Sequence, residues 1–282
     1  MHPDDFEFVA RLLKDRSGLV LTRDKGYLVE NRLMPLVRQR RMKGINDVIA
    51  GLRAGEASLT DSVVDAMMAK DTAFFRDWKP FEHFRTVVLP NLIAQRGTKK
   101  TFRVLCAGVS TGQEAYSLAI IMREYGRALA GWKAEIVGVD ISAASIATAQ
   151  LALYSQFDVQ RGLPIRLLLK HFKKRDESWS LNGDIQGMVG FMRWNLMDDL
   201  FPLGRFDVIL CRNVLVYNDL QTKFNVLQKL ARVAADDGVL YVGRNEPLTG
   251  VSSSFKVVNP DLGVYTVTRA EKATTRSLAD AT

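Results

Sequence analysis

The chain has 282 residues, enough for one main domain and a smaller second one. Its 47% hydrophobic and 25% charged residues are typical of a soluble globular protein, and no apolar run reaches the roughly 18–20 residues that a membrane span needs, so we expect no membrane insertion. The net charge of +8 favours an acidic partner but is too small to indicate nucleic acid. The first residues are charged and lack the apolar stretch of a signal peptide, which predicts a cytoplasmic location.

Cysteines and histidines are too sparse and too scattered to predict a metal centre. Cys106 and Cys211 each lie in an apolar run that ends at a predicted loop, which indicates buried free thiols rather than a disulfide. His2, His83 and His171 are far apart in the sequence, and no recognised ligand spacing joins them to the cysteines. We therefore expect no bound metal ion.

The first 85 residues have the apolar spacing of helices and no strand signal. The segments with this periodicity are 6–13, 27–42, 45–55 and 58–70. Gly18 stands where the first helix should stop, and Pro35 should kink the second helix or split it in two. We predict an all-helical domain over residues 1–85, followed by a linker over residues 86–100.

A basic cluster follows the second predicted helix. Arg38, Arg40, Arg41 and Lys43 lie within six residues of one another. One interpretation is a solvated helix face. The other is a docking surface for an acidic helix or a phosphate backbone.

From residue 101 the pattern changes to short apolar strands that alternate with helices. Strands are predicted at 101–108, 134–140, 206–212 and 238–244, helices at 113–129, 142–153 and 219–234, and a final antiparallel pair at 255–258 and 264–268. This alternation is typical of an α/β fold, a mostly parallel sheet covered by helices on both faces. We predict this domain over residues 101–270, with a small β insertion at 172–193 and a flexible tail at 271–282.

The turn after the first strand has the features of a nucleotide site. Gly108 and Gly112 let the backbone come close to a ligand, although the full dinucleotide fingerprint is absent. Asp140 ends the second strand, where a carboxylate can accept hydrogen bonds from both hydroxyls of a ribose. These features alone suit a nicotinamide enzyme, a methyltransferase or a purely structural turn.

Six sequence blocks make the interpretation specific. They are DTAFFRD (71–77), AGVSTGQEAYSLA (107–119), VGVD (137–140), FMRWNL (191–196), FDVILCRNVLVY (206–217) and GVLYVGRNE (238–246). Their order and spacing resemble those of the CheR chemoreceptor methyltransferases over nearly the whole chain. The resemblance implies an S-adenosylmethionine-dependent, Rossmann-like methyltransferase sheet with an N-terminal all-helical domain and a small inserted β-subdomain.

The resemblance also implies which residues bind S-adenosylmethionine. Glu114 would receive the methionine ammonium and Asp140 the ribose hydroxyls. The other implied cofactor residues are Asn195 and Leu196 at the adenine, Arg212 and Asn213 beside the methionine moiety, Gly108 in the glycine turn, and Thr72 and Arg76 in the segment that closes over the cofactor.

The implied methyl acceptors are glutamate side chains on the cytoplasmic helices of methyl-accepting chemoreceptors. A glutamate with a pKa near 4.3 is ionised at neutral pH, so the transfer needs orientation and no general base. Arg76 can hold a carboxylate in a fork and Tyr217 can donate one directed hydrogen bond, and the resemblance points to the same two residues as catalytic. Arg38, Arg40 and Arg41 would then lie against the acidic receptor helices.

Some features depart from the family pattern or leave other functions open. Lys70 stands where an asparagine near the cofactor is usual, and a cation there would weaken cofactor binding unless it points away. The stretch 173–178 is short and lacks glycine, as in relatives that do not dock on a receptor tether. We also expect a monomer. The rival functions are a non-catalytic, cofactor-binding signalling scaffold and a nucleic-acid methyltransferase. Cys211 follows Leu210 at a strand end, which favours a core thiol over the nucleophile of a cytosine enzyme.

Overall fold

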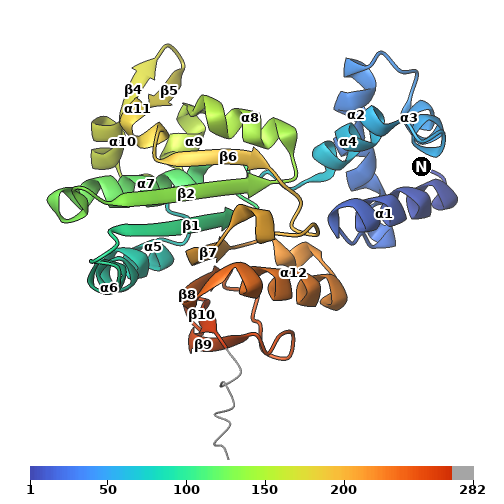
Figure 1. Ribbon diagram of the computed structural model, residues 1–282. Coiled ribbons are helices and arrows are strands. Elements are labelled where there is room, and N and C mark those ends of the chain that lie inside the picture. The colour runs from blue at the N-terminus through green and yellow to red at the C-terminus, as the bar shows by residue number, and fades with distance from the viewer. Residues whose placement is uncertain (269–282) are drawn as a thin grey trace, which may run out of the picture.

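The computed structural model describes residues 1–268, so the tail predicted at 271–282 lies outside the described residues (Figure 1). Four helices form the N-terminal domain: α1 (Pro3–Ser17), α2 (Gly26–Gln39), α3 (Ile45–Arg53) and α4 (Ala57–Met67). They pack their apolar faces into a common core that includes Val9, Leu33, Val48 and Val63. Gly18 ends α1 in a left-handed conformation, as its position in the sequence predicts.

Pro35 does not split the second helix. α2 continues from Gly26 to Gln39 with Pro35 inside it, so of the two predicted outcomes, a kink or a split, the split does not occur. Leu33, Leu36 and Val37 on either side of the proline are buried in the domain core. Their burial holds the helix together across the hydrogen bond that proline cannot donate.

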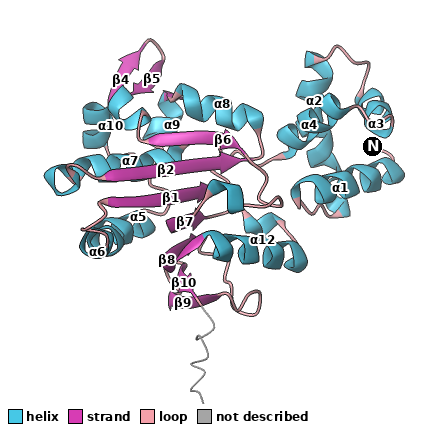
Figure 2. Ribbon diagram, viewed as in Figure 1, coloured by secondary structure: helices cyan, strands magenta, loops and turns pink. Residues whose placement is uncertain are grey.

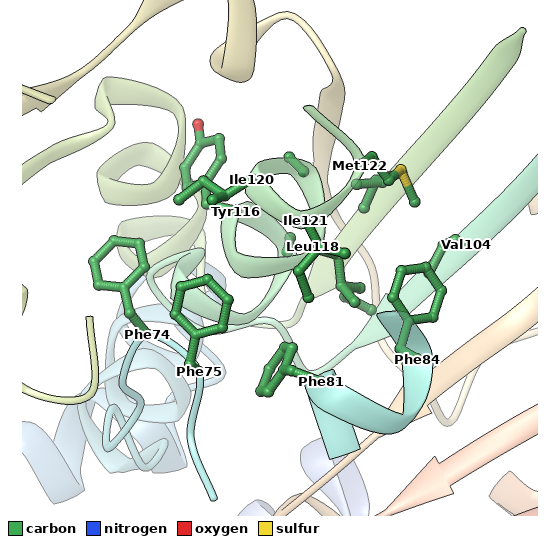
Figure 3. Close-up of a cluster of buried hydrophobic side chains, with 14 of the residues drawn as sticks. Phe74, Phe75, Phe81, Phe84, Val104, Tyr116, Leu118, Ile120, Ile121 and Met122 are labelled. Carbon is green, nitrogen blue, oxygen red and sulfur yellow. The ribbon is translucent and has the colours of Figure 1, made fainter. Parts of the chain in front are cut away.

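The boundary between the two domains lies earlier than predicted. The N-terminal core ends with α4, and the predicted linker 86–100 contains most of a π-helical turn (Phe84–Val88) and all of α6 (Leu89–Gln95), which continue from α5 (Lys79–His83). Figure 3 shows Phe74, Phe75, Phe81 and Phe84 gathered beside Tyr116 and Leu118 of α7 (Gln113–Glu124), within one buried cluster. Because these side chains are buried against the sheet domain, residues from 74 onward belong to that domain.

The larger domain is built on a seven-stranded sheet, and the predicted mostly parallel sheet is confirmed (Figure 2). In spatial order its strands are β6 (Val189–Arg193), β2 (Lys133–Asp140), β1 (Thr101–Ala107), β7 (Phe206–Cys211), β8 (Ala234–Val242), β10 (Val264–Val267) and β9 (Phe255–Asn259). The first five are parallel and β10 is antiparallel to both of its neighbours.

Both faces of this sheet are covered. Along β1, Val104 and Cys106 join the buried cluster that contains α6 and α7, whereas Leu105 and Ala107 join the cluster that contains α12 (Leu220–Val233). The chain moves outward from β1 to β2 and β6, then returns to form β7 on the other side of β1. This change of direction between β1 and β7 is where open α/β sheets bind ligands, at the carboxyl ends of the strands.

The β insertion differs from the predicted range of 172–193. β3 (Leu153–Ser155), β5 (Ser178–Leu181) and β4 (Phe172–Arg175) form a separate three-stranded sheet, so the insertion begins earlier. At its other end, β6 pairs with β2 in the main sheet and is not part of the insertion. β6 is an edge strand with no fully buried residue, and its pairing with β2 depends on tertiary packing that its sequence does not reveal. The helices α8 (Ala143–Leu151), α9 (Gln156–Gln160), α10 (Ile165–His171) and α11 (Gly183–Gln186) complete this part of the chain.

Two features of residues 1–268 bear on the class of function that the protein can have. None of the helices in this range combines the length and the apolar character needed to cross a membrane. Within the same range, no three histidine, cysteine or acidic side chains come together as metal ligands would.

Candidate functional site

A pocket of about 340 Å³ lies between the N-terminal helices and the carboxyl ends of β1, β2 and β7. Figure 1 shows α1 and α4 beyond the strand ends on this side of the sheet. The residues predicted from the sequence for cofactor binding and catalysis all line this pocket: Thr72, Arg76, Gly108, Glu114, Asp140, Asn195, Leu196, Arg212, Asn213 and Tyr217. Segments far apart in the chain therefore meet around one cavity.

Asp140 is held by the backbone of two loops. Its Oδ2 accepts a hydrogen bond from the Ser110 amide at 2.8 Å, and its Oδ1 accepts one from the Ser142 amide at 2.9 Å. Burial raises the pKa of the Asp140 carboxyl, and these two hydrogen bonds act in the opposite direction. Each oxygen has a second lone pair, so the carboxylate can still accept from a pair of neighbouring hydroxyls.

The glycine turn is packed too tightly for a side chain. Gly108 has φ of +74°, and a Cβ there would lie 2.4 Å from Cγ2 of Val214. The loop that follows β7 therefore rests directly on the loop that follows β1. Both loops line the pocket, so Gly108 fixes the distance between two of its walls.

Arg212 is the most deeply buried charge of the pocket, with 1% of its side chain exposed. Its Nη1 donates to Oε2 of Glu114 at 2.9 Å, and its Nη2 donates to Oδ2 of Asp77 at 2.6 Å and to the carbonyl of Arg76 at 3.1 Å. The guanidinium also lies over the ring of Phe81, 5.6 Å from its centroid. Burial raises the pKa of Glu114, and the adjacent Arg212 charge opposes this shift. Arg212 thus joins the base of α7 to the segment that enters the sheet domain.

Arg76 and Tyr217 lie at the rim of the pocket. The Arg76 side chain is 30% exposed and pairs with the Asp71 carboxylate at 3.2 Å and the Asp71 carbonyl at 2.8 Å. Arg161 binds the same carboxylate at 2.8 Å. The Arg161 hydrogen bond and then the Arg76 charge hold the pKa of Asp71 below its usual value. Tyr217 is 46% exposed, so both side chains are partly open to solvent, although both terminal nitrogens of Arg76 are engaged by Asp71.

Hydrogen bonds fasten the N-terminal domain over the pocket. The Asn195 side chain donates to the Arg16 carbonyl at 2.8 Å, and the Asn218 side chain donates to the Gly18 carbonyl at 2.8 Å. The Val20 amide donates to the Tyr217 carbonyl at 2.9 Å. These contacts connect the end of α1 to two loops of the sheet domain, and sequence patterns give no signal for them because the partners lie about 180–200 residues apart.

Three buried polar atoms of the pocket residues have no hydrogen-bond partner among residues 1–268: Ser110 Oγ, Trp194 Nε1 and Arg212 Nε. Buried polar groups are nearly always hydrogen-bonded, so their clustering fits a pocket built for a polar ligand. Leu196 and Val109 add apolar surface beside them. Glu114 can receive an ammonium group and Asp140 a ribose, and the rest of the lining is partly polar and partly apolar. Such a pocket suits an adenosyl amino acid.

Lys70 lines a separate groove between α2, α4 and the start of α8, where its ammonium is 3.8 Å from the Asp65 carboxylate. Its charge still acts on Asp140, because burial raises the pKa of that carboxyl and the Lys70 charge contributes a smaller effect in the opposite direction. Cys211 is fully buried, and burial raises the pKa of its thiol well above the ordinary value, which agrees with a core thiol.

The basic cluster is divided by the structure. Arg38, Arg41 and Lys43 are exposed. Arg40 instead donates to Glu56 Oε1 at 2.8 Å and to Ser62 Oγ at 2.9 Å. The end of α2 thereby holds the start of α4, so Arg40 has a structural role that its position in the sequence does not reveal.

Asp140→Ala should weaken cofactor binding at least tenfold. It removes the acceptor for two hydroxyl groups, each worth about 1.5–3 kcal/mol when the acceptor is charged. The measurement is calorimetric titration with S-adenosylhomocysteine. Asp184→Ala, an exposed carboxylate change on α11 outside the pocket, is the control and should leave the affinity unchanged. Equal affinities of wild type and Asp140→Ala would show that the end of β2 is not the ribose site.

Comparison with known proteins agrees with this geometry. Residues 70–264 match the family described as CheR methyltransferase, SAM binding domain, and residues 4–68 match the CheR methyltransferase all-alpha domain. The chain is 32% identical to Chemotaxis protein methyltransferase 1 of Pseudomonas aeruginosa over 92% of this chain and 96% of the relative. It is 31% identical to Chemotaxis protein methyltransferase Cher2 of Pseudomonas putida, over 92% and 96%, and to a Chemotaxis protein methyltransferase of Vibrio parahaemolyticus, over 92% and 95%. The chain therefore belongs to the CheR methyltransferase family, enzymes that use S-adenosylmethionine.

Proposed function

We propose that this enzyme transfers the methyl group of S-adenosylmethionine to glutamate side-chain carboxylates of methyl-accepting chemoreceptors, forming glutamate methyl esters. The observation that carries the proposal is the rim of the pocket, which is lined by the partly exposed guanidinium of Arg76 and the partly exposed phenol of Tyr217. These two groups match an acidic acceptor. Among the described residues that line the pocket there is no histidine and no cysteine.

The proposed chemistry needs orientation more than acid–base catalysis. Bound cofactor would supply an electrophilic methyl group on a sulfonium, and the leaving group is a neutral thioether. The acceptor carboxylate is already ionised at neutral pH, since its ordinary pKa is near 4.3. Arg76 would hold the acceptor and Tyr217 would direct it or the methyl donor. Orientation of two reactants can contribute roughly 7–11 kcal/mol to a barrier, so no base is required.

The chemoreceptor partner is proposed from charge and from the inserted sheet. Arg38 and Arg41 are exposed on the N-terminal domain and complement acidic receptor helices, which would place the reaction in the cytoplasm. In the insertion, β4 and β5 are joined by a two-residue turn, Asp176 and Glu177. A turn this short supports docking that does not depend on a receptor tether. We propose that the enzyme acts as a monomer.

Charge reversal of the exposed arginines should separate docking from catalysis. Arg38→Glu/Arg41→Glu should raise the receptor KM several-fold and leave the affinity for S-adenosylhomocysteine unchanged, because these residues lie outside the pocket. Lys99→Glu/Arg127→Glu is the matched control. It makes the same change in net charge at exposed positions on the amino-end side of the sheet. Equal receptor KM values for the two double variants would assign Arg38 and Arg41 to a solvated face.

The direct test is incubation of the enzyme with tritiated-methyl S-adenosylmethionine and receptor-containing membranes. The proposal predicts label in the receptor that mild base releases as methanol. A signalling scaffold would bind the cofactor and transfer no label. A nucleic-acid methyltransferase would instead label added DNA or RNA, with binding that weakens steeply as salt increases.

A further inference from the structure

Glu246 is a buried carboxylate beside the pocket that is not among the residues lining it. The residue follows β8 in the chain and is 5% exposed. Oε2 accepts hydrogen bonds from the backbone amides of Asn213 at 2.5 Å and Gly243 at 2.9 Å, and Oε1 accepts one from the Val216 amide at 2.8 Å. A carboxylate is the side chain that suits three converging N–H donors, because it only accepts.

The donors belong to the loop that forms one wall of the cofactor pocket. Residues 213–217 follow β7, all of them line the pocket, and the loop ends at Tyr217. Asn213 has φ of +60°, the left-handed conformation, which asparagine adopts more readily than most other non-glycine residues. Val214 occupies the space over Gly108 where a Cβ would otherwise lie. The loop is thus held from inside by Glu246 and rests on the glycine turn.

Gly243 leaves the space that the Glu246 carboxylate and the Asn213 amide occupy. A Cβ at this glycine would lie 2.4 Å from Glu246 Oε2 and 3.0 Å from the Asn213 amide nitrogen. Gly243 is not among the residues with positive φ, so glycine is required there for space and not for backbone conformation. A side chain at position 243 would displace the carboxylate from the amides it binds.

We infer that Glu246 is a positioning residue that sets the conformation of the Asn213–Tyr217 loop, and through it the placement of Tyr217 and the affinity for the cofactor. The part of this inference that concerns Tyr217 rests on the proposed methyl transfer to a carboxylate. The part that concerns cofactor affinity does not, because residues of the loop line the pocket.

Two variants perturb the same contact differently. Glu246→Gln replaces one oxygen by an NH₂ group, which must face an N–H donor, so at least one hydrogen bond is lost. Gly243→Ala keeps the carboxylate and pushes it away. The matched control is Asp207→Asn. Asp207 lies at the opposite end of β7, where its Oδ2 accepts from the Arg103 amide at 2.9 Å, so this change alters a similar contact far from the pocket.

The experiment combines calorimetric titration with S-adenosylhomocysteine, melting temperatures, and kcat for receptor methylation at saturating cofactor. Glu246→Gln and Gly243→Ala should weaken cofactor binding about fivefold or more and lower kcat about tenfold or more. Asp207→Asn should keep cofactor affinity and kcat within about twofold of wild type, even if its melting temperature falls as much as theirs. In the Glu246→Gln background, Tyr217→Phe should lower kcat by a clearly smaller factor than it does in the wild type, because the phenol is already misplaced.

The inference is overturned if Glu246→Gln and Gly243→Ala have the same cofactor affinity and kcat as Asp207→Asn. It is also overturned if the effects of Glu246→Gln and Tyr217→Phe on kcat are independent, so that the double variant shows their product. A wild-type enzyme that methylates no receptor would refute the proposed function, while the titrations would still decide whether Glu246 sets the cofactor wall. If Glu246→Gln does not fold, Gly243→Ala and its melting temperature carry the same comparison.

Discussion

Arg212→Met should destroy measurable cofactor binding and lower the free energy of unfolding by about 3–5 kcal/mol, the range found when one partner of a buried ion pair is removed. Arg212 is almost fully buried, and its loss would leave Glu114 charged or protonated in a site that burial already makes unfavourable for the anion. It would also free the Arg76–Asp77 segment that Arg212 holds. Denaturant unfolding and titration with S-adenosylhomocysteine measure the two effects.

Two further variants test this explanation. Arg96→Met breaks ion pairs with Asp207 and Asp237 at the opposite side of the sheet and should leave cofactor affinity unchanged. Adding Glu114→Gln to Arg212→Met removes the isolated charge and should recover part of the lost stability. A double variant no more stable than Arg212→Met would mean that the Glu114 charge is not the source of the loss.

Tyr217→Phe should lower kcat about ten- to a hundredfold, equivalent to ~1.4–2.7 kcal/mol for one directed hydrogen bond in the transition state. The hydroxyl is on a half-exposed ring, so its removal should change neither the melting temperature nor, beyond a few-fold, the cofactor affinity. Arg76→Lys keeps the charge and loses the fork, so it should also be impaired. Tyr27→Phe, on an exposed ring of α2, is the matched control and should be fully active.

The pH dependence of the wild-type rate distinguishes orientation from base catalysis. Because the acceptor is already ionised, the rate between about pH 6 and 9 should show no step that belongs to a catalytic base. A rate that rises with a pKa near 7 and loses this step in one histidine variant would contradict the mechanism. A fully active Tyr217→Phe enzyme would leave the orientation of the acceptor to Arg76 alone.

The central strands, Gly108 and Asp140 could be predicted because their signals are local, whereas most of the other pocket residues could be predicted only from the family resemblance. Runs such as 101–108 and 206–212 are apolar enough to identify buried strands, and polar residues directly after them lie where the parallel strands end. The sequence patterns place the edge strand β6 and the helices α5 and α6 in the wrong parts of the fold. Half-exposed residues in β6 and the burial of Phe81 and Phe84 against α7 depend on tertiary packing.

The supporting contacts of the site could not be predicted for a related reason. Asp77 binds Arg212, Asp71 binds Arg76, and Glu246 holds the Asn213 loop. In the sequence these acids are three of 31 acidic residues, and only long-range proximity distinguishes them from solvated ones. The same limit applies to Arg40, whose partner Glu56 directly precedes α4 and lies 16 residues further along the chain.

The most direct test of the central claim identifies the methylated atom. Purified receptor cytoplasmic helices are incubated with S-adenosylmethionine and either the wild-type enzyme or Tyr217→Phe, and the peptides are then analysed by mass spectrometry. We expect one added methyl group on particular glutamates. Mild base treatment should remove it, and Tyr217→Phe should form it much more slowly than the wild type. Base-stable methylation on lysine, arginine or cysteine, or no methylation by an enzyme that binds the cofactor tightly, would contradict it.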